Sequence, residues 1–187
     1  MEKELKLHLS PLFVIFILIS VSWFITKTPW YQFVYLFFGF LWGSFALDLD
    51  HLIYWLYLRP NLEESRLAQV ALQKKDFGSL LKLLETTHKN HTSLIFHHFF
   101  FQIVLLLISF FVFTSSTNIF AKSFLLALNI HLFIDEYHDY LHDKIHLQDW
   151  LFAREESQLS VNYLSYYLGI VAILNLVFSY LLLRSFL

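Results

Sequence analysis

The sequence predicts an all-α protein of one domain, residues 1–187, folded as a polytopic membrane bundle with about five transmembrane helices. The first observation is composition: the chain of 187 residues is 57% hydrophobic and 20% aromatic, with a mean hydropathy of +0.56. Soluble domains of this length are far less apolar. The second observation is that five apolar segments approach the roughly 20 residues that a helix needs to cross a bilayer.

The five predicted spans cover residues 11–25, 33–58, 93–113, 119–135 and 162–183. The first is closed by the turn-like TKTPW, and no small-residue cleavage site follows it, so we expect a retained helix. Residues 59–92 interrupt the spans with an amphipathic helical pattern, which predicts a cytoplasmic segment lying along the membrane surface. Residues 136–160 form a second cytoplasmic segment, rich in histidine and aspartate.

Composition also excludes several functions. The chain has no cysteine, which rules out disulfides, thiolate metal sites and a cysteine nucleophile. Its formal net charge is -2 and it has no dense basic patch, so nucleic acid is not an expected partner. The anomaly is ten histidines in so short a chain.

The distribution of lysine and arginine between loops predicts that the N-terminus is inside and the C-terminus outside. Most of the 13 basic residues then lie on the inner side, and all 15 acidic residues fall in the inner half of the protein. We therefore expect an integral membrane protein whose polar site faces the cytoplasm.

Three short motifs place ionisable groups in or beside these spans. FALDLDH puts Asp48, Asp50 and His51 inside the second span, where a charge costs about 3 kcal/mol on insertion scales unless it is paired or hydrated. The two aspartates lie about 200 degrees apart on a helix. Both can therefore serve one ion only if the helix bends or ends there, or if one of them hydrogen-bonds to a ligand of the ion and does not bind the ion itself.

The second motif, THKNHTSLIFHH, spaces His88 and His91 as two ligands on one helical face. Imidazole is a common ligand of zinc and also suits iron and copper. His97 and His98 follow two turns later, and the sequence leaves open whether they are ligands or interfacial side chains.

The third motif, NIHLFIDEYHDYLHDKIH, lines up His131 and Asp135 on adjacent turns of one helix, in an apolar setting. His138, His142 and His146 continue the stripe. For Asp139, Asp143 and His146 we expect a solvated polar face.

The predicted topology brings these motifs to one depth near the inner surface. The set is large enough for one or two divalent cations, with zinc favoured over manganese or iron, and with positions left for water. Asp50 and Glu136 are the candidate general bases. The candidate metal ligands are Asp48, Asp50, His51, His88, His91, His131 and Asp135.

The motifs resemble those of the membrane-bound metal-dependent hydrolases, some of which belong to the LexA-regulated DNA-damage response of bacteria. FFGFLWGSFALDLDH is similar to the family's glycine-containing helix with an Asp-x-Asp-His ending, with Leu47 where the family has proline. HKNHTS is similar to its His-Arg and Thr-His-Ser segment, with Lys89 at the arginine, and HLFID to its His-x-x-x-Asp helix. The last motif also resembles zinc-dependent phospholipases C.

This resemblance implies a protein of the bacterial inner (cytoplasmic) membrane that hydrolyses a phosphoester in a lipid or lipid-linked substrate at the inner leaflet. Two other classes stay open: a membrane di-iron oxygenase of the desaturase kind, and a non-enzymatic metal-binding or transport protein. His138 and His142 fit the HxxxH box of the oxygenases, but the chain contains no HxxHH box. Transporters tend to show internal repeats and broken spans, which the sequence does not suggest.

Overall fold

The computed structural model describes residues 2–87, 91–153, 155 and 159–186, with side chains from Leu9 onward. Within these residues the regular structure is entirely helical, as predicted. The elements are α1 (Glu2–Ile25), α2 (Trp30–Ala46), α3 (Leu49–Ile53), the π-helical turn η1 (Tyr54–Leu58), α4 (Glu63–Gln73), α5 (Phe77–Thr87), α6 (Phe99–Ser115), α7 (Ile119–His142), α8 (Lys144–Leu151), α9 (Val161–Leu183) and the 3-10 turn η3 (Arg184–Phe186).

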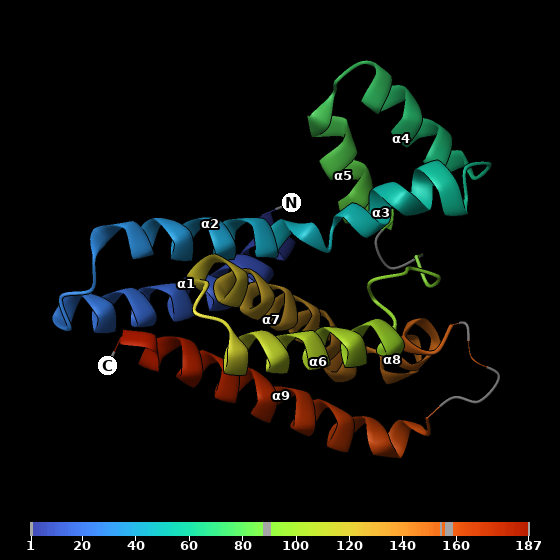
Figure 1. The fold of residues 1–187 in the computed structure, drawn as a ribbon. Helices are drawn as coiled ribbons and strands as arrows, with labels where there is room; N and C mark the ends of the chain where they lie inside the picture. The colour runs from blue at the N-terminus through green and yellow to red at the C-terminus, as the bar shows by residue number, and fades with distance from the viewer. Residues whose placement is uncertain (1, 88–90, 154, 156–158, 187) are drawn as a thin grey trace.

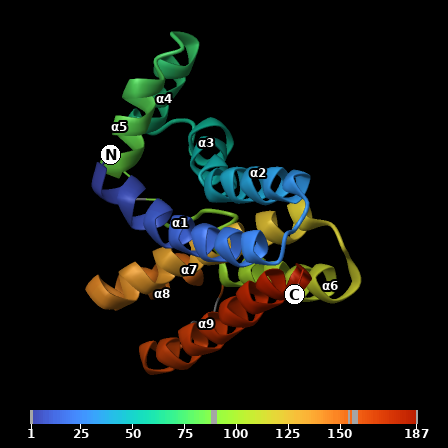
Figure 2. The same cartoon turned by 90° about the vertical axis from the view of Figure 1, so that its left-hand side faces the viewer.

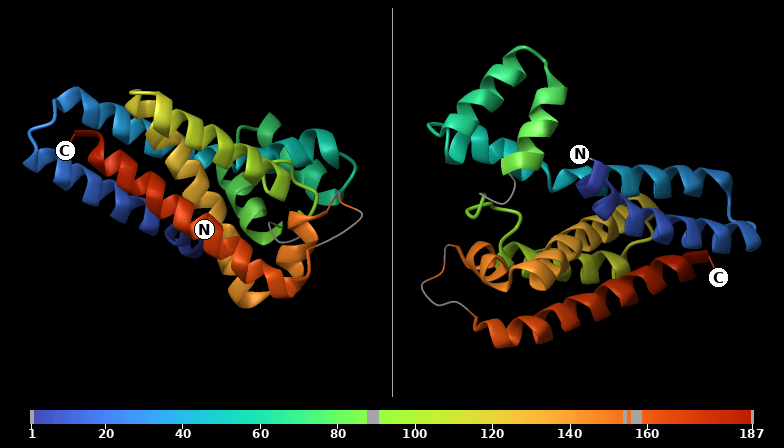
Figure 3. Two further views of the ribbon diagram at one scale, coloured as in Figure 1. Left: turned by 60° about the horizontal axis from the view of Figure 1, so that its bottom comes forward. Right: turned by 180° about the vertical axis from the view of Figure 1, so that it is seen from behind.

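Five long helices, α1, α2, α6, α7 and α9, form a bundle with α7 in contact with all of the others (Figure 1). Seen from behind, α7 lies between the α1–α2 pair and α9 (Figure 3). Helices α2 and α7 run toward the end of the bundle where α8 lies, and α1, α6 and α9 run away from it. The segments that carry the histidine and aspartate motifs therefore gather at one end.

The closest helix pair is α2 with α7, and small residues explain it. A β-carbon added at Gly39 would lie 1.9 Å from Ser123 Oγ, and one added at Gly43 would lie 2.6 Å from the Ala127 β-carbon. The Gly-x-x-x-Gly spacing thus lets the two backbones meet, as small residues do between membrane helices. Continued for one more turn, the same register brings the end of α2 beside His131.

The second predicted span is not one uninterrupted α-helix. Helix α2 ends at Ala46, and the amides of Asp48, Asp50 and His51 bond to carbonyls three residues earlier, which tightens the chain before α3. Helices α4 and α5 then form a hairpin that stands off the bundle (Figure 2). The third predicted span is also shorter than expected, because residues 93–98 are not helical and α6 begins at Phe99.

Two helical stretches of the described residues are long and apolar enough to cross a membrane: residues 30–58 and 161–186. The apolar parts of α1 and α6 are shorter, at Leu9–Ile25 and Phe99–Ser115. A five-span topology therefore stays a prediction, although each of the five predicted segments is helical over most of its length.

Candidate metal centre

Four ionisable side chains from three segments converge at the α8 end of the bundle. Asp135 Oδ2 lies 3.5 Å from His131 Nε2, one turn earlier on α7, and 3.6 Å from Nε2 of His97, in the loop before α6. Asp48 Oδ1 lies 3.9 Å from His131 Nε2. His97, His131 and Asp135 are almost fully buried, whereas the Asp48 side chain is 39% exposed.

These distances suit the ligands of a small cation. Nitrogen and oxygen atoms bound at about 2.0–2.2 Å around a tetrahedral zinc ion lie roughly 3.3–3.6 Å from one another. In the described part of the chain, no three histidine or acidic side chains already surround one point as a formed metal site. The separations of Asp135 Oδ2 from His131 Nε2 and from His97 Nε2 nonetheless match those between two ligands of one zinc ion, and imidazole with carboxylate is a donor set that zinc accepts.

Asp50 lies on the far side of His97 from this group. Its Oδ2 accepts the backbone N–H of Phe96 and is 3.3 Å from His97 Nδ1. His97 thus lies between the carboxylates of Asp50 and Asp135. Asp50 Oδ1 is buried and has no hydrogen-bond partner among the described residues, so the carboxylate keeps one oxygen for a further interaction.

A second group of side chains adjoins the first. Nδ1 of His51 and Nδ1 of His91 are 2.7 Å apart, so one of them donates a hydrogen bond to the other. His91 Nε2 lies 3.2 Å from Glu64 Oε1 of α4, and the Tyr54 ring stacks on His91 with centroids 4.2 Å apart. The ring centroids of His51 and His97 are 5.6 Å apart, so the two groups of side chains form one polar region.

The structure brings most of the predicted ligands together. Asp48, Asp50, His51, His91, His131 and Asp135 all lie in the two groups just described. His88 falls outside the described residues. The candidate base Glu136 is buried, and its Oε1 accepts a hydrogen bond from the Tyr167 hydroxyl of α9 at 2.7 Å.

Sequence reasoning left one member of the site open and missed another. His97 was ambiguous because a histidine that begins an apolar segment is often interfacial, and its contacts with Asp50 and Asp135 come from distant parts of the chain. Glu64 was missed altogether. It sits in an amphipathic segment with other charged residues, and only the folding back of α4 brings it to His91.

The expected solvated face at the end of α7 is only partly exposed. Asp139 Oδ2 accepts hydrogen bonds from His146 Nδ1 and Trp150 Nε1, both at 2.8 Å, and the Asp139 side chain is 16% exposed. Burial would raise the pKa of Asp139, but these hydrogen bonds dominate and lower it. They also hold Trp150, whose ring lies edge-on to His97 at 5.9 Å. Asp143 is exposed, as expected, and caps α8.

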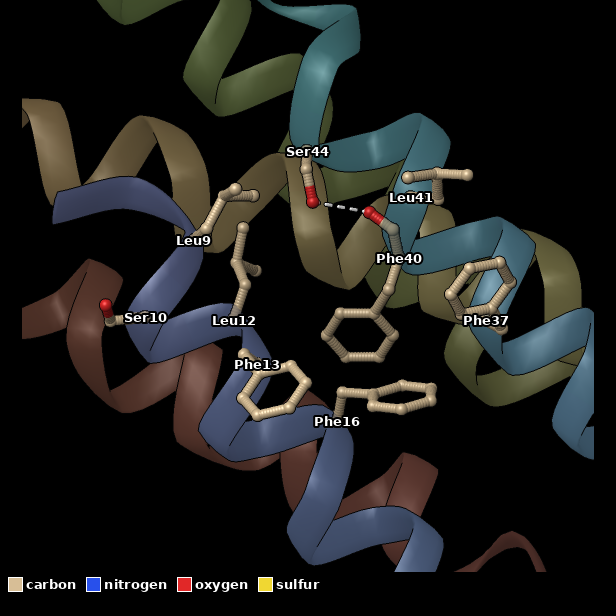
Figure 4. Close-up of a pocket in the computed structure, with 9 residues that line it drawn as sticks. All are labelled: Leu9, Ser10, Leu12, Phe13, Phe16, Phe37, Phe40, Leu41 and Ser44. Atoms are coloured by element: carbon tan, nitrogen blue, oxygen red, sulfur yellow. Dashed lines mark hydrogen bonds between the residues drawn. The ribbon is translucent and has the colours of Figure 1, made fainter. Parts of the chain in front are cut away.

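Two apolar cavities lie near the bundle surface. One, of about 300 Å³, is lined by α3, η1 and α5 and has Asp48 and His51 in its wall. The other, of about 370 Å³, lies between α1 and α2 and is lined by apolar side chains and two serines (Figure 4). The Ser44 hydroxyl donates to the Phe40 carbonyl at 2.6 Å, within its own helix. Among the described residues, candidate ligands line the first of these two cavities and not the second.

Comparison with known proteins adds no family to this geometry: no family model, no curated protein and no solved structure matches the chain. The class of the protein therefore has to be argued from its site.

Proposed function

We propose that this protein is a metal-dependent hydrolase embedded in the bacterial inner membrane, cleaving a phosphoester of a lipid at the cytoplasmic leaflet. The observation that carries the proposal is that Asp135 Oδ2 lies 3.5 Å from His131 Nε2 and 3.6 Å from His97 Nε2, with Asp50 at the far nitrogen of His97. We propose five membrane crossings with the N-terminus inside, which would put this group at the inner surface.

His97, His131 and Asp135 would hold the cation, zinc in the first instance. Asp50 acts as a positioning residue, because a carboxylate on the second nitrogen of a ligating histidine fixes both its tautomer and its ring orientation. A cation bound here supplies Lewis acidity, polarising a phosphoryl oxygen and lowering the pKa of water.

Asp48 is the best candidate for the general base. Its carboxylate is next to His131 and is 39% exposed, so it can reach both water and a substrate phosphate. Asp48 would take a proton from the attacking water as the oxygen–phosphorus bond forms, and would return it to the leaving alcohol oxygen. Glu136 is a weaker candidate, because its carboxylate is engaged by Tyr167 on α9.

The proposal is tested on detergent-purified protein by elemental analysis and by hydrolysis of phospholipids. We expect the purified protein to contain stoichiometric zinc or manganese. We also expect it to hydrolyse a phosphoester bond of the phospholipid, so that the released product carries or lacks the phosphate according to which of the two bonds is cleaved. His131→Ala should lose both the metal and the activity. The matched control is His142→Ala, since His142 is exposed and bonds only within α7 as far as the described contacts show.

Metal that stays bound in His131→Ala would refute this site. Absence of metal from the wild-type protein after supplementation would refute the hydrolase proposal. Two irons per chain with an oxo-bridge absorption would instead favour the oxygenase class.

A further inference from the structure

The apolar cavity beside the candidate metal centre has a composition that suits one kind of ligand. Among the residues that the structure describes, its ionisable lining residues are Asp48 and His51, and the others are leucine, phenylalanine and tryptophan side chains from α3, η1 and α5. Its volume of about 300 Å³ is at the small end of ligand pockets, which run from about 300 to 1,000 Å³. The cavity is therefore suited to a slender apolar group.

The polar end of this cavity coincides with the proposed site of hydrolysis. Asp48 belongs to the cavity wall and is also within 3.9 Å of His131 Nε2. A ligand with its hydrocarbon portion in the cavity would place its polar head at the candidate cation ligands.

A tryptophan in the wall carries an unused hydrogen-bond donor. Trp55 is 1% exposed, and its indole N–H has no hydrogen-bond partner among the described residues. A buried unpaired donor costs about 1–3 kcal/mol, so a ligand with a nearby acceptor would gain by pairing with it. The carbonyl of a fatty-acid ester is such an acceptor.

The cavity is also continuous with a surface suited to the membrane. Phe77 and Leu81 of α5 line the cavity and are 65% and 50% exposed. The same hairpin exposes Lys74, Lys75 and Lys82, which are attracted to anionic lipid head groups. An α4–α5 hairpin resting on the inner leaflet would thus open the cavity toward lipid chains.

We infer that this cavity holds one acyl chain of the phospholipid substrate, with the phosphoester at Asp48 and His131. The inference rests on the proposed function in taking the substrate to be a lipid. It adds that the enzyme recognises an acyl chain, and that α5 forms the wall against which the chain lies.

Quenching of Trp55 fluorescence by brominated lipid chains tests occupancy directly. The protein is reconstituted into phosphatidylcholine nanodiscs containing phosphatidic acid with brominated acyl chains. Bromine quenches tryptophan only on contact, and Trp55 is buried away from bulk lipid. We expect the wild type to show a quenched component that Trp55→Phe lacks. Equal fractional quenching of the wild type and Trp55→Phe would overturn the inference.

A variant that narrows the cavity provides the second test. Leu84→Phe adds volume to the cavity wall, and Leu67→Phe is the matched control, an exposed position on α4 that does not line this cavity. We expect Leu84→Phe to abolish the quenched component and to slow hydrolysis of a long-chain phosphatidic acid at least tenfold. Leu67→Phe should keep the wild-type metal content and the wild-type rate on both the long-chain phosphatidic acid and a short, water-soluble phosphoester.

The two tests separate the inference from the proposed function. If the wild type cleaves the short phosphoester but shows no Trp55 quenching, only the acyl-chain cavity is refuted. If Trp55 is quenched but no phosphoester is cleaved, the cavity stands as a lipid site and the hydrolase proposal falls. Equal slowing in Leu84→Phe and Leu67→Phe would overturn the role of α5 as the cavity wall.

Discussion

Helices α2 and α7 approach to backbone contact where Gly43 packs against Ala127. A β-carbon at Gly43 would lie 2.5 Å from the Phe124 carbonyl oxygen and 2.6 Å from the Ala127 β-carbon, distances that real side chains do not tolerate. This contact fixes the register of α2 on α7 one turn before Asp48 and His131, so the bundle and the candidate site depend on the same approach of two helices.

Gly43→Ala is therefore expected to destabilise the protein by about 1–3 kcal/mol, the usual cost of overpacking a tight contact. Gly169→Ala is the matched control, because nothing lies within 4 Å of a β-carbon at Gly169. The control should be neutral or slightly stabilising, since alanine favours a helix over glycine. Thermal unfolding in detergent measures both. Similar melting temperatures for the two variants would contradict the close α2–α7 contact.

Asp50→Asn should weaken metal binding without abolishing it. Asp50 contacts His97 at the nitrogen opposite to the proposed cation, and loss of such a partner typically costs 10–100-fold in metal affinity. Competition with a chromophoric chelator measures the dissociation constant. Asp149→Asn, at an exposed position of α8, should leave it unchanged. Complete loss of metal from Asp50→Asn would indicate that Asp50 is itself a ligand.

Chelation should lower the stability of the wild-type protein. A ligand present at about 100 times its dissociation constant stabilises the folded state by about 2.7 kcal/mol, and chelation removes that contribution. The melting temperature of the wild type should therefore fall on addition of a chelator, whereas that of His131→Ala should not respond. An equal response of the two proteins would mean that the chelator acts elsewhere.

Asp139 should make stability depend on pH in the acid range. Its pKa is lowered in the folded protein by hydrogen bonds from His146 and Trp150. The stabilising contribution is thus complete above the unfolded pKa of about 4, and is lost as the pH falls through the lower folded value.

Asp139→Asn should cost about 1–2 kcal/mol at pH 7, in keeping with hydrogen bonds to a charged acceptor. The difference in unfolding free energy between the wild type and this variant should shrink as the pH falls below about 4. Urea unfolding at several pH values measures it. A difference that is constant with pH would show that the charge of Asp139 does not contribute.

The sequence allowed the helical segments and several site residues to be predicted, because both rest on local pattern. Apolar runs of helical length predicted five helices, and the four-residue spacing of His131 and Asp135 placed them on one face of α7. The break at Leu47 and Asp48 was expected only as a condition for Asp48 and Asp50 to act together. The π-helical turn after α3 had no sequence signal.

Composition and spacing by themselves determined that the chain is helical, strongly apolar, and equipped with paired imidazoles and carboxylates near the ends of its helices. Only the tertiary structure decided which of these groups meet. Glu64 reaches His91 because α4 packs back against η1, and His97 lies between Asp50 and Asp135 because the loop before α6 passes between α3 and α7. Such pairings join residues far apart in the chain, and their geometry depends on side-chain volume and helix approach, which no local pattern encodes.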